Sequence, residues 1–229
     1  MKHRARSALL VLLAVLALTL RAQSEEPSVD LSAPLPLDPA IATHGTLANG
    51  LAYWVLPHAM PKGRVSLVLR LDSGSLQEEE NQRGLAHFLE HMAFNGSKHF
   101  PPGEVVQYFE SIGMRFGRDQ NAFTAFDQTA YMLNLPDTRP ATLEKGLLFL
   151  SDVGQGLALT PEEVEKERGV ILEEARARGG VRMRMMEKTL PLLLPDARLA
   201  RRIPIGDPEV VRTAPAERLR AYYRTWYRP

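Results

Sequence analysis

The sequence predicts an α+β domain with a mainly antiparallel sheet and helices packed on one face of that sheet. Asn49-Gly50 stands between two apolar runs, which is a strong signal for a β-hairpin. Alternating and β-branched residues in "RVSLVLRLDSGS" and "NAFTAFDQTAYMLNLP" predict further strands. Segments with helical periodicity follow these strands without a regular strand-helix alternation, and that order is typical of an α+β layer structure.

The expected helices are marked by apolar spacing and by their ends. "EEENQRGLAHFLEHMAFNGS" has apolar residues at helical spacing and a stop signal at Asn95-Gly96, and "GEVVQYFESIG" follows as a second helix. "TRPATLEKGLLFLSDVGQGL" and "TPEEVEKERGVILEEARAR" predict two long helices, and Thr160 and Pro161 supply the cap and first turn of the second one. The remainder of the chain is also predicted to be helical.

The first 24 residues have the pattern of an export signal. Lys2 and Arg4 precede an apolar run from Ala8 to Leu20, and polar residues follow it. Because a membrane-spanning helix needs roughly 20 apolar residues, we expect a cleaved signal peptide over 1–24 and a periplasmic or secreted protein. An uncleaved membrane anchor is the alternative. Residues 25–42, rich in Pro, Ser and Asp, predict an extended tether, and 43–229 predict one domain.

Charge and cysteine content restrict the kinds of partner. The 229 residues carry a formal net charge of +1, which argues against an overall electrostatic design for nucleic acid. From Arg168 onward there are 14 Lys and Arg against 7 Asp and Glu, but these arginines alternate with carboxylates at helical spacing, as on a solvated helix face. We therefore expect no nucleic-acid partner. Without cysteine, any metal must be held by nitrogen and oxygen.

The stretch "GLAHFLEHMAF", which begins at Gly84, concentrates metal-binding side chains on one helix face. His87 and His91 are four positions apart, so both imidazoles can reach one ion. Glu90 projects to one side of His87, where it can hold a water without being a ligand. Zinc held by three protein groups keeps a fourth position for water and makes that water more acidic. The pattern therefore predicts a zinc site with its own base, and two ordinary helical histidines are the alternative.

A third ligand is expected on the helix over residues 161–178. At 100° per residue, Glu167 and Glu174 share one arc with Val164 and Ile171, so two carboxylates lie on the apolar side of this helix. A buried carboxylate needs a partner, and a metal supplies one. The two glutamates are about 10.5 Å apart along the axis, so only one is expected to touch the ion. Glu163, at the edge of the arc, competes with them.

Four ordered segments carry a resemblance to a known family. They are "GSLQEEENQRGLAHFLEHMAFNGSKHF", "NAFTAFDQTAYMLNLP", "EVEKERGVILEEAR" and the closing "YYRTWYRP" after "PIGDPEVV". Over residues 43–229 the chain resembles the pitrilysin-type zinc peptidases with the inverted HxxEH motif, which include insulin-degrading enzyme and the catalytic subunit of the mitochondrial processing peptidase. The resemblance implies the α+β fold of these peptidases and a zinc-dependent endopeptidase.

Roles for individual residues follow from this resemblance. It implies that His87 and His91 are zinc ligands, that Glu167 is the third ligand, and that one Zn²⁺ is bound. It also implies that Glu90 is the general base and that Glu174 assists catalysis by orienting the zinc-binding helix from behind the ligands. Glu167 is thereby chosen over its competitors.

The same resemblance implies a substrate-binding strand. In the family, the strand that matches Asn121, Ala122 and Phe123 adds the backbone of a peptide or unfolded polypeptide as an extra strand beside the zinc. Backbone pairing of this kind holds any extended peptide, while side-chain pockets select among sequences. An ordinary strand end is the alternative.

The chain differs from the family pattern in its length. Relatives carry at least one more domain of related fold that closes the active site, and their sheet continues beyond the position of Pro229. We therefore expect a second homologous domain or chain as a partner and a domain truncated at its C-terminal end. The alternative function is a non-catalytic or split-enzyme partner domain of the same fold, which needs a second chain for activity. A purely structural zinc site would not require Glu90.

Overall fold

The structure is a computed structural model that describes residues 43–229. The expected signal peptide and tether lie outside these residues. The described part falls into two compact units, of which the smaller comprises residues up to Gly45 and Tyr53–Pro57. This unit holds most of a two-stranded sheet formed by β1 (Thr43–Thr46) and β2 (Ala52–Val55). The hairpin predicted around Asn49-Gly50 is confirmed.

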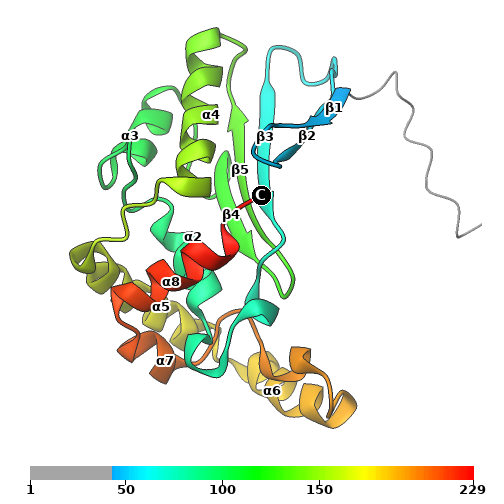
Figure 1. The fold of residues 1–229 in the computed structure, drawn as a ribbon, viewed down its shortest axis with the longest axis vertical. Coiled ribbons are helices and arrows are strands. Elements are labelled where there is room, and N and C mark those ends of the chain that lie inside the picture. Colours follow the sequence, from blue (N-terminus) through cyan, green and yellow to red (C-terminus); the bar gives the residue numbers. More distant parts are fainter. Residues whose placement is uncertain (1–42) are drawn as a thin grey trace, which may run out of the picture. The chain divides into compact units, whose positions relative to one another are not determined.

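The larger unit contains a three-stranded antiparallel sheet (Figure 1). Its strands are β3 (Val65–Leu71), β4 (Gln120–Thr124) and β5 (Thr129–Leu135), in the spatial order β3-β5-β4. Tyr131 at the centre of β5 is opposite Leu69 on one side and Ala122 on the other. Because β5 lies in the middle, β4 is an edge strand of this sheet.

Helices pack on one face of the sheet, as predicted. Following the chain, the helices before the C-terminal part are α2 (Leu85–Met92), α3 (Glu104–Ser111), α4 (Pro140–Gln155) and α5 (Pro161–Arg178). α4 contacts β3 and β5, whereas α2 contacts β4 and β5. Gly146 allows the close approach of α4, because a Cβ atom there would come within 2.8 Å of Leu67 Cδ1. The sheet therefore has one face closed by helices from two separate parts of the chain.

The start of α2 differs from the expectation. Residues 78–83 were expected to belong to the helix, but they contain only a short 3-10 turn, η2 (Glu80–Gln82), which follows another such turn, η1 (Ser75–Gln77). Gly84 has a φ of 102°, a left-handed conformation that few other residues adopt, and α2 begins directly after it. The helix that carries the two histidines is consequently short, and its position is set by the turns before it.

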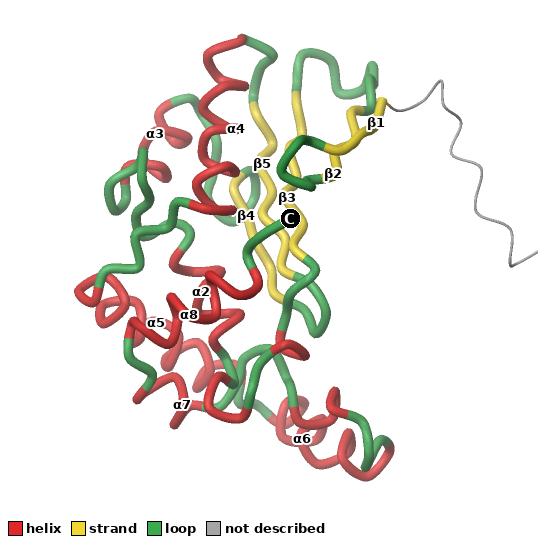
Figure 2. Tube along the Cα trace, in the orientation of Figure 1, coloured by secondary structure: helices red, strands yellow, loops and turns green. Residues whose placement is uncertain are grey.

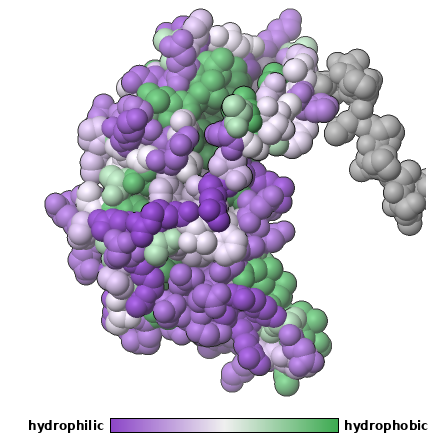
Figure 3. Space-filling view, in the orientation of Figure 1, coloured by the Kyte–Doolittle hydropathy of each residue, from purple (hydrophilic) through white to green (hydrophobic). Residues whose placement is uncertain are grey.

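The C-terminal part is helical, as the sequence predicts (Figure 2). It contains α6 (Val181–Leu193), η3 (Arg198–Arg201), α7 (Pro208–Thr213) and α8 (Ala216–Trp226). Hydrophilic residues cover α7 and α8 on the surface in Figure 3. Arg220 and Arg224 pair with Glu217 on α8, at 3.3 and 2.7 Å. Within residues 43–229, no helix combines the length and the apolar character needed to cross a bilayer.

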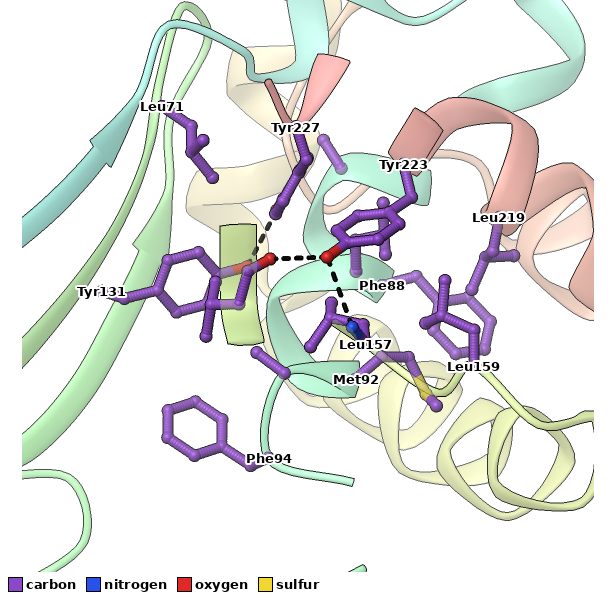
Figure 4. Close-up of a cluster of buried hydrophobic side chains, with 14 of the residues drawn as sticks. Leu71, Phe88, Met92, Phe94, Tyr131, Leu157, Leu159, Leu219, Tyr223 and Tyr227 are labelled. Atoms are coloured by element: carbon purple, nitrogen blue, oxygen red, sulfur yellow. Dashed lines mark hydrogen bonds between the residues drawn. The ribbon is translucent and has the colours of Figure 1, made fainter. Parts of the chain in front are cut away.

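A buried cluster joins α2 to the sheet and to α8 (Figure 4). Phe88 and Met92 of α2 share this cluster with Leu219 and Tyr223 of α8, and both α2 residues are almost completely buried. Each large apolar side chain buried in this way contributes roughly 1.5 to 3 kcal/mol to stability. The histidine helix is therefore held rigidly from its apolar side, and its polar side is left to form a site.

Candidate metal centre

α2 is fixed at its N-terminal end by a buried carboxyl group. Glu78 Oε1 accepts a hydrogen bond of 2.8 Å from the backbone N–H of Ala86, in the first turn of the helix. Glu78 is fully buried, and burial raises the pKa of its carboxyl to about 7. The capping contact sets the direction from which His87 and His91 project.

His87 and His91 present their Nε2 atoms to the same carboxylate. The ring centroids are 4.7 Å apart, and the two Nε2 atoms are 3.5 and 3.3 Å from Glu174 Oε2 on α5. One ligand atom from each of these three residues lies within 4.8 Å of the other two. Among residues 43–229, this is the group of His, Asp and Glu side chains whose geometry suits a metal ion.

The residues fit a zinc ion in donor type and in hydrogen bonding. Glu174 Oε2 is buried and has no hydrogen-bond partner, although two imidazole nitrogens face it. Arg178 pairs with the other oxygen of the same carboxylate. A buried carboxylate oxygen without a partner is costly, and a cation between it and the imidazoles would satisfy it. Two nitrogens and one oxygen leave a fourth position open, as in catalytic zinc sites.

The protonation of His87 suits metal binding. Burial, followed by the neighbouring His91 and Arg178, lowers the pKa of His87 to about 3. Its imidazole is therefore neutral at physiological pH. A neutral imidazole offers a lone pair on one ring nitrogen, which is what a metal ion requires.

Glu167 lies on the opposite side of His91 from Glu174. Its Oε1 accepts a hydrogen bond of 2.7 Å from His91 Nδ1, so this carboxylate faces away from the Nε2 atoms. The hydrogen bond to His91 lowers the pKa of Glu167 and keeps it ionised. The structure therefore has Glu174, and not the expected Glu167, facing the Nε2 atoms of both histidines. Glu163, the other competitor, pairs with Lys166 at 2.7 Å instead.

Glu90 lies beside the histidines and is held by the edge strand. Thr124 Oγ1 at the end of β4 donates a hydrogen bond of 2.6 Å to Glu90 Oε2. Burial raises the pKa of Glu90, and the hydrogen bond from Thr124 offsets part of this effect. A partly buried carboxylate with a raised pKa, next in the chain to a histidine of the candidate metal centre, has the properties expected of a general base.

The three residues expected to bind substrate are on β4. Asn121 and Phe123 are exposed, Ala122 is half-buried, and Asn121 Oδ1 accepts a hydrogen bond of 2.9 Å from the N–H of Ala122. β4 pairs with β5 along one side, and within the three-stranded sheet its other side has no strand beside it. Since Thr124 of the same strand reaches Glu90, this free edge lies next to the candidate base.

Sequence reasoning missed three polar residues that hold the carboxylates. Thr124 contacts Glu90, Asn95 donates to Glu167, and Arg178 pairs with Glu174. A helical spacing of four residues could have indicated the contact between Arg178 and Glu174. The other two contacts join segments far apart in the chain, and no local pattern signals them.

Comparison with known proteins identifies the family of this chain. Residues 53–191 match the model of the insulinase family (peptidase family M16). The chain belongs to this family. The mixed helix and antiparallel-sheet fold of the domain that carries His87, His91 and Glu174 is the one seen in pitrilysin-like structures.

Two relatives are much longer than this chain. The probable zinc protease PqqL of Escherichia coli is 43% identical over 212 residues, which make up 93% of this chain and 23% of that protein. The chloroplastic stromal processing peptidase of Oryza sativa subsp. indica is 32% identical over 209 residues, or 90% of this chain and 16% of that protein. The chain spans about a quarter or less of the length of these relatives.

Solved structures support the same fold. The first half of the periplasmic protease PqqL from Escherichia coli superposes with a TM-score of 0.81 at 44% identity, covering 86% of this chain and 42% of that one. The ferredoxin protease FusC, solved in complex with Arabidopsis ferredoxin, gives a TM-score of 0.77 at 34% identity over 82% of this chain and 21% of that one. Pitrilysin gives 0.68 at 26% identity, over 81% of this chain and 20% of its own.

Proposed function

We propose that this chain is the zinc-binding domain of an endopeptidase, with His87, His91 and Glu174 as the metal ligands and Glu90 as the general base. One observation carries the proposal. Ligand atoms of two histidines and one glutamate, from two helices far apart in the chain, converge within 4.8 Å of one another. The buried, unpartnered Oε2 atom of Glu174 supports a cation at this point.

A zinc ion held by these residues would polarise the carbonyl of the scissile peptide bond and make a water molecule acidic enough to attack it. Glu90 accepts the proton from the attacking water and delivers it to the leaving amine as the C–N bond breaks. Thr124 holds Glu90 Oε2 during this transfer, so the carboxylate keeps one orientation. Glu167 keeps the proton of His91 on Nδ1 and leaves Nε2 free for the metal.

The proposed substrate is an extended peptide or an unfolded segment that adds to the free edge of β4. Asn121, Ala122 and Phe123 would supply the backbone and side-chain contacts. The end of this strand touches the proposed base through Thr124, so a peptide paired along β4 would pass the metal ligands. Backbone pairing selects for extended chains over folded ones, because folded chains have few free backbone groups.

A second domain or chain is proposed as the partner that closes the site. The solved relative that this domain matches is described as the first half of a protease, and the chain covers 42% of that half. We propose a periplasmic or secreted location, because the Escherichia coli relative is described as periplasmic and residues 1–24 have the pattern of an export signal.

Zinc content and peptide cleavage test the proposal together. We expect the purified chain to bind one zinc, Glu90→Gln to bind one zinc, and His91→Ala to bind none. Cleavage of an unstructured fluorogenic peptide is measured for the chain alone and with the second half of the Escherichia coli relative supplied separately. In whichever condition the wild-type chain cleaves, Glu90→Gln should lose about 10²-fold or more of the rate.

The matched control is Glu110→Gln, which makes the same chemical change at an exposed position of α3. This variant should cleave like the wild type. A wild-type chain that binds no zinc would contradict the proposed metal site. Zinc binding without cleavage in either condition would instead favour the non-catalytic partner domain, and equal rates for Glu90→Gln and wild type would exclude Glu90 as the base.

A further inference from the structure

The segment that follows α2 is fixed by contacts with the end of α4. The N–H of Asn95 donates to Met92 O at 3.1 Å, and Gly96 adopts a left-handed φ of 111°. Gly96 O then accepts a hydrogen bond of 3.1 Å from the N–H of Ala158, and the N–H of Lys98 donates to Gly156 O at 2.8 Å. Backbone bonds on both sides of Asn95 therefore determine where its side chain points.

The side chain of Asn95 points at Glu167 on α5. Its Nδ2 donates a hydrogen bond of 2.5 Å to Glu167 Oε2, while Glu167 Oε1 accepts from His91 Nδ1 at 2.7 Å. An ionised carboxylate only accepts hydrogen bonds, so the amide nitrogen of Asn95 must be the atom that faces it. The result is a chain of hydrogen bonds from Asn95 through Glu167 to His91.

We propose that Asn95 is a positioning residue of the metal site, which acts on His91 through Glu167. This inference rests on the proposed zinc site and adds a residue whose side chain does not reach the ligand atoms. With one oxygen held by Asn95, the Glu167 carboxylate has a single orientation in which its other oxygen meets His91 Nδ1. That bond fixes both the tautomer and the ring direction of His91, so Nε2 points at the metal position before any ion arrives.

The physical need for a second donor follows from the partial exposure of Glu167. Its side chain is 16% exposed and comes from a different helix than His91. A carboxylate held by one bond can rotate about its terminal torsion, which is broad and has low barriers. The amide of Asn95 removes this freedom, because the segment around Gly96 is anchored to the end of α4. Preorganised ligands lose less entropy when the metal binds.

Zinc affinity, measured by competition with a chromophoric chelator, tests the proposal without an activity assay. We expect Asn95→Ala to weaken zinc binding by about 3- to 10-fold, somewhat less than the loss of a group that contacts a ligand directly. Asn95→Asp preserves the shape of the side chain but removes the donor, so it should weaken binding at least as much. The melting temperature of the metal-free protein should stay within about 2 °C of wild type for both variants.

A double-mutant cycle separates a positioning role from a local packing effect. In a Glu167→Ala background, Asn95→Ala should change zinc affinity by less than about 2-fold, because the residue through which it acts is gone. Asn134→Asp, the same substitution at an exposed position of β5, is the control and should leave the affinity unchanged. Wild-type affinity in both Asn95 variants would overturn the proposal, as would losses that multiply fully in the double mutant. Absence of zinc binding in the wild type would instead overturn the metal site itself.

Discussion

Glu174 Oε2 lies 3.3 Å from His91 Nε2, whereas Glu167 contacts the other nitrogen of the same ring. One imidazole therefore separates two carboxylates with different surroundings. Glu174 has a buried oxygen without a hydrogen bond, and Glu167 has both oxygens engaged by donors. The first arrangement suits a metal ligand, and the second suits a group that orients one.

The two glutamates should consequently differ in their effect on zinc affinity. Glu167→Gln removes the negative charge behind His91 and leaves one carbonyl oxygen to serve the two donors His91 and Asn95, so it should weaken binding by roughly 10- to 100-fold. Glu174→Gln replaces the proposed carboxylate ligand by a neutral amide, a much poorer zinc ligand, and should weaken binding by clearly more than that. Chelator competition on both variants gives the comparison. A larger loss for Glu167→Gln than for Glu174→Gln would reverse the assignment.

Thr124 should affect turnover and leave zinc binding unchanged. Thr124→Val keeps the shape of the side chain but removes the donor to Glu90 Oε2, so the carboxylate loses its fixed orientation. We expect kcat to fall about 10-fold with little change in KM, and Thr124→Ser to restore most of the rate. The assay uses the condition in which the wild-type chain cleaves peptide. A change in KM alone would mean that Thr124 acts on peptide binding at β4.

Glu78 makes stability depend on pH in a predictable direction. Its pKa is raised from 4.5 to about 7 by burial, so between these values the folded protein holds a proton that the unfolded chain releases. Stability contributed by the protonated group is complete below pH 4.5 and is lost as the pH rises through 7. Glu78→Gln keeps an acceptor for the Ala86 N–H and does not ionise. As the pH rises from 4 to 8, the free energy of unfolding of the variant should increase by roughly 2 to 3 kcal/mol relative to that of the wild type.

Urea unfolding of the metal-free proteins across this pH range measures the difference. The difference in the free energy of unfolding between the variant and the wild type isolates Glu78, because groups that the substitution does not affect titrate in the same way in both proteins. A difference that is constant from pH 4 to pH 8 would show that Glu78 does not change its ionisation on folding. If the wild type became more stable relative to the variant as the pH rose, the pH dependence would have the opposite sign to the one expected.

The buried hydroxyl pair between the sheet and the C-terminal segment should stabilise the fold. Tyr131 and Tyr227 share a hydrogen bond of 2.8 Å inside the cluster drawn in Figure 4. Tyr131→Phe leaves the Tyr227 hydroxyl buried with a lost partner, which should cost roughly 1 to 3 kcal/mol in the free energy of unfolding. Tyr108→Phe, at a half-buried position of α3, is the control and should cost no more than about 0.5 kcal/mol. Equal effects of the two substitutions would argue against a contribution from the pair.

Local sequence patterns were sufficient for most elements of the fold. The alternation in β4 and β5, the turn signal at Asn49-Gly50 and the capping residues of α5 each reflect interactions between near neighbours, and these elements appear where expected. The predicted start of α2 was wrong, because a tertiary contact outweighs the helical tendency of the residues before Gly84. Glu78 is buried as the cap of α2, so its segment turns away from the helical path.

The candidate site was predictable in composition and only partly in geometry. Helical periodicity placed Glu167 and Glu174 on the same buried side of α5, and both do meet His91. Periodicity does not determine how α5 is oriented over α2, and this orientation decides which glutamate faces the Nε2 atoms. The contacts of Asn95 and Thr124 depend on the same tertiary packing, so they become visible only in the folded structure.

A zinc-loaded crystal structure of this chain, with the ion located by anomalous scattering, tests the central claim most directly. The account predicts one ion within about 2.0 to 2.1 Å of the Nε2 atoms of His87 and His91 and about 2.0 to 2.2 Å of a Glu174 oxygen. Glu167 should remain bonded to His91 Nδ1. An ion coordinated by Glu167 with Glu174 turned away, or an ion bound elsewhere in the chain, would contradict it.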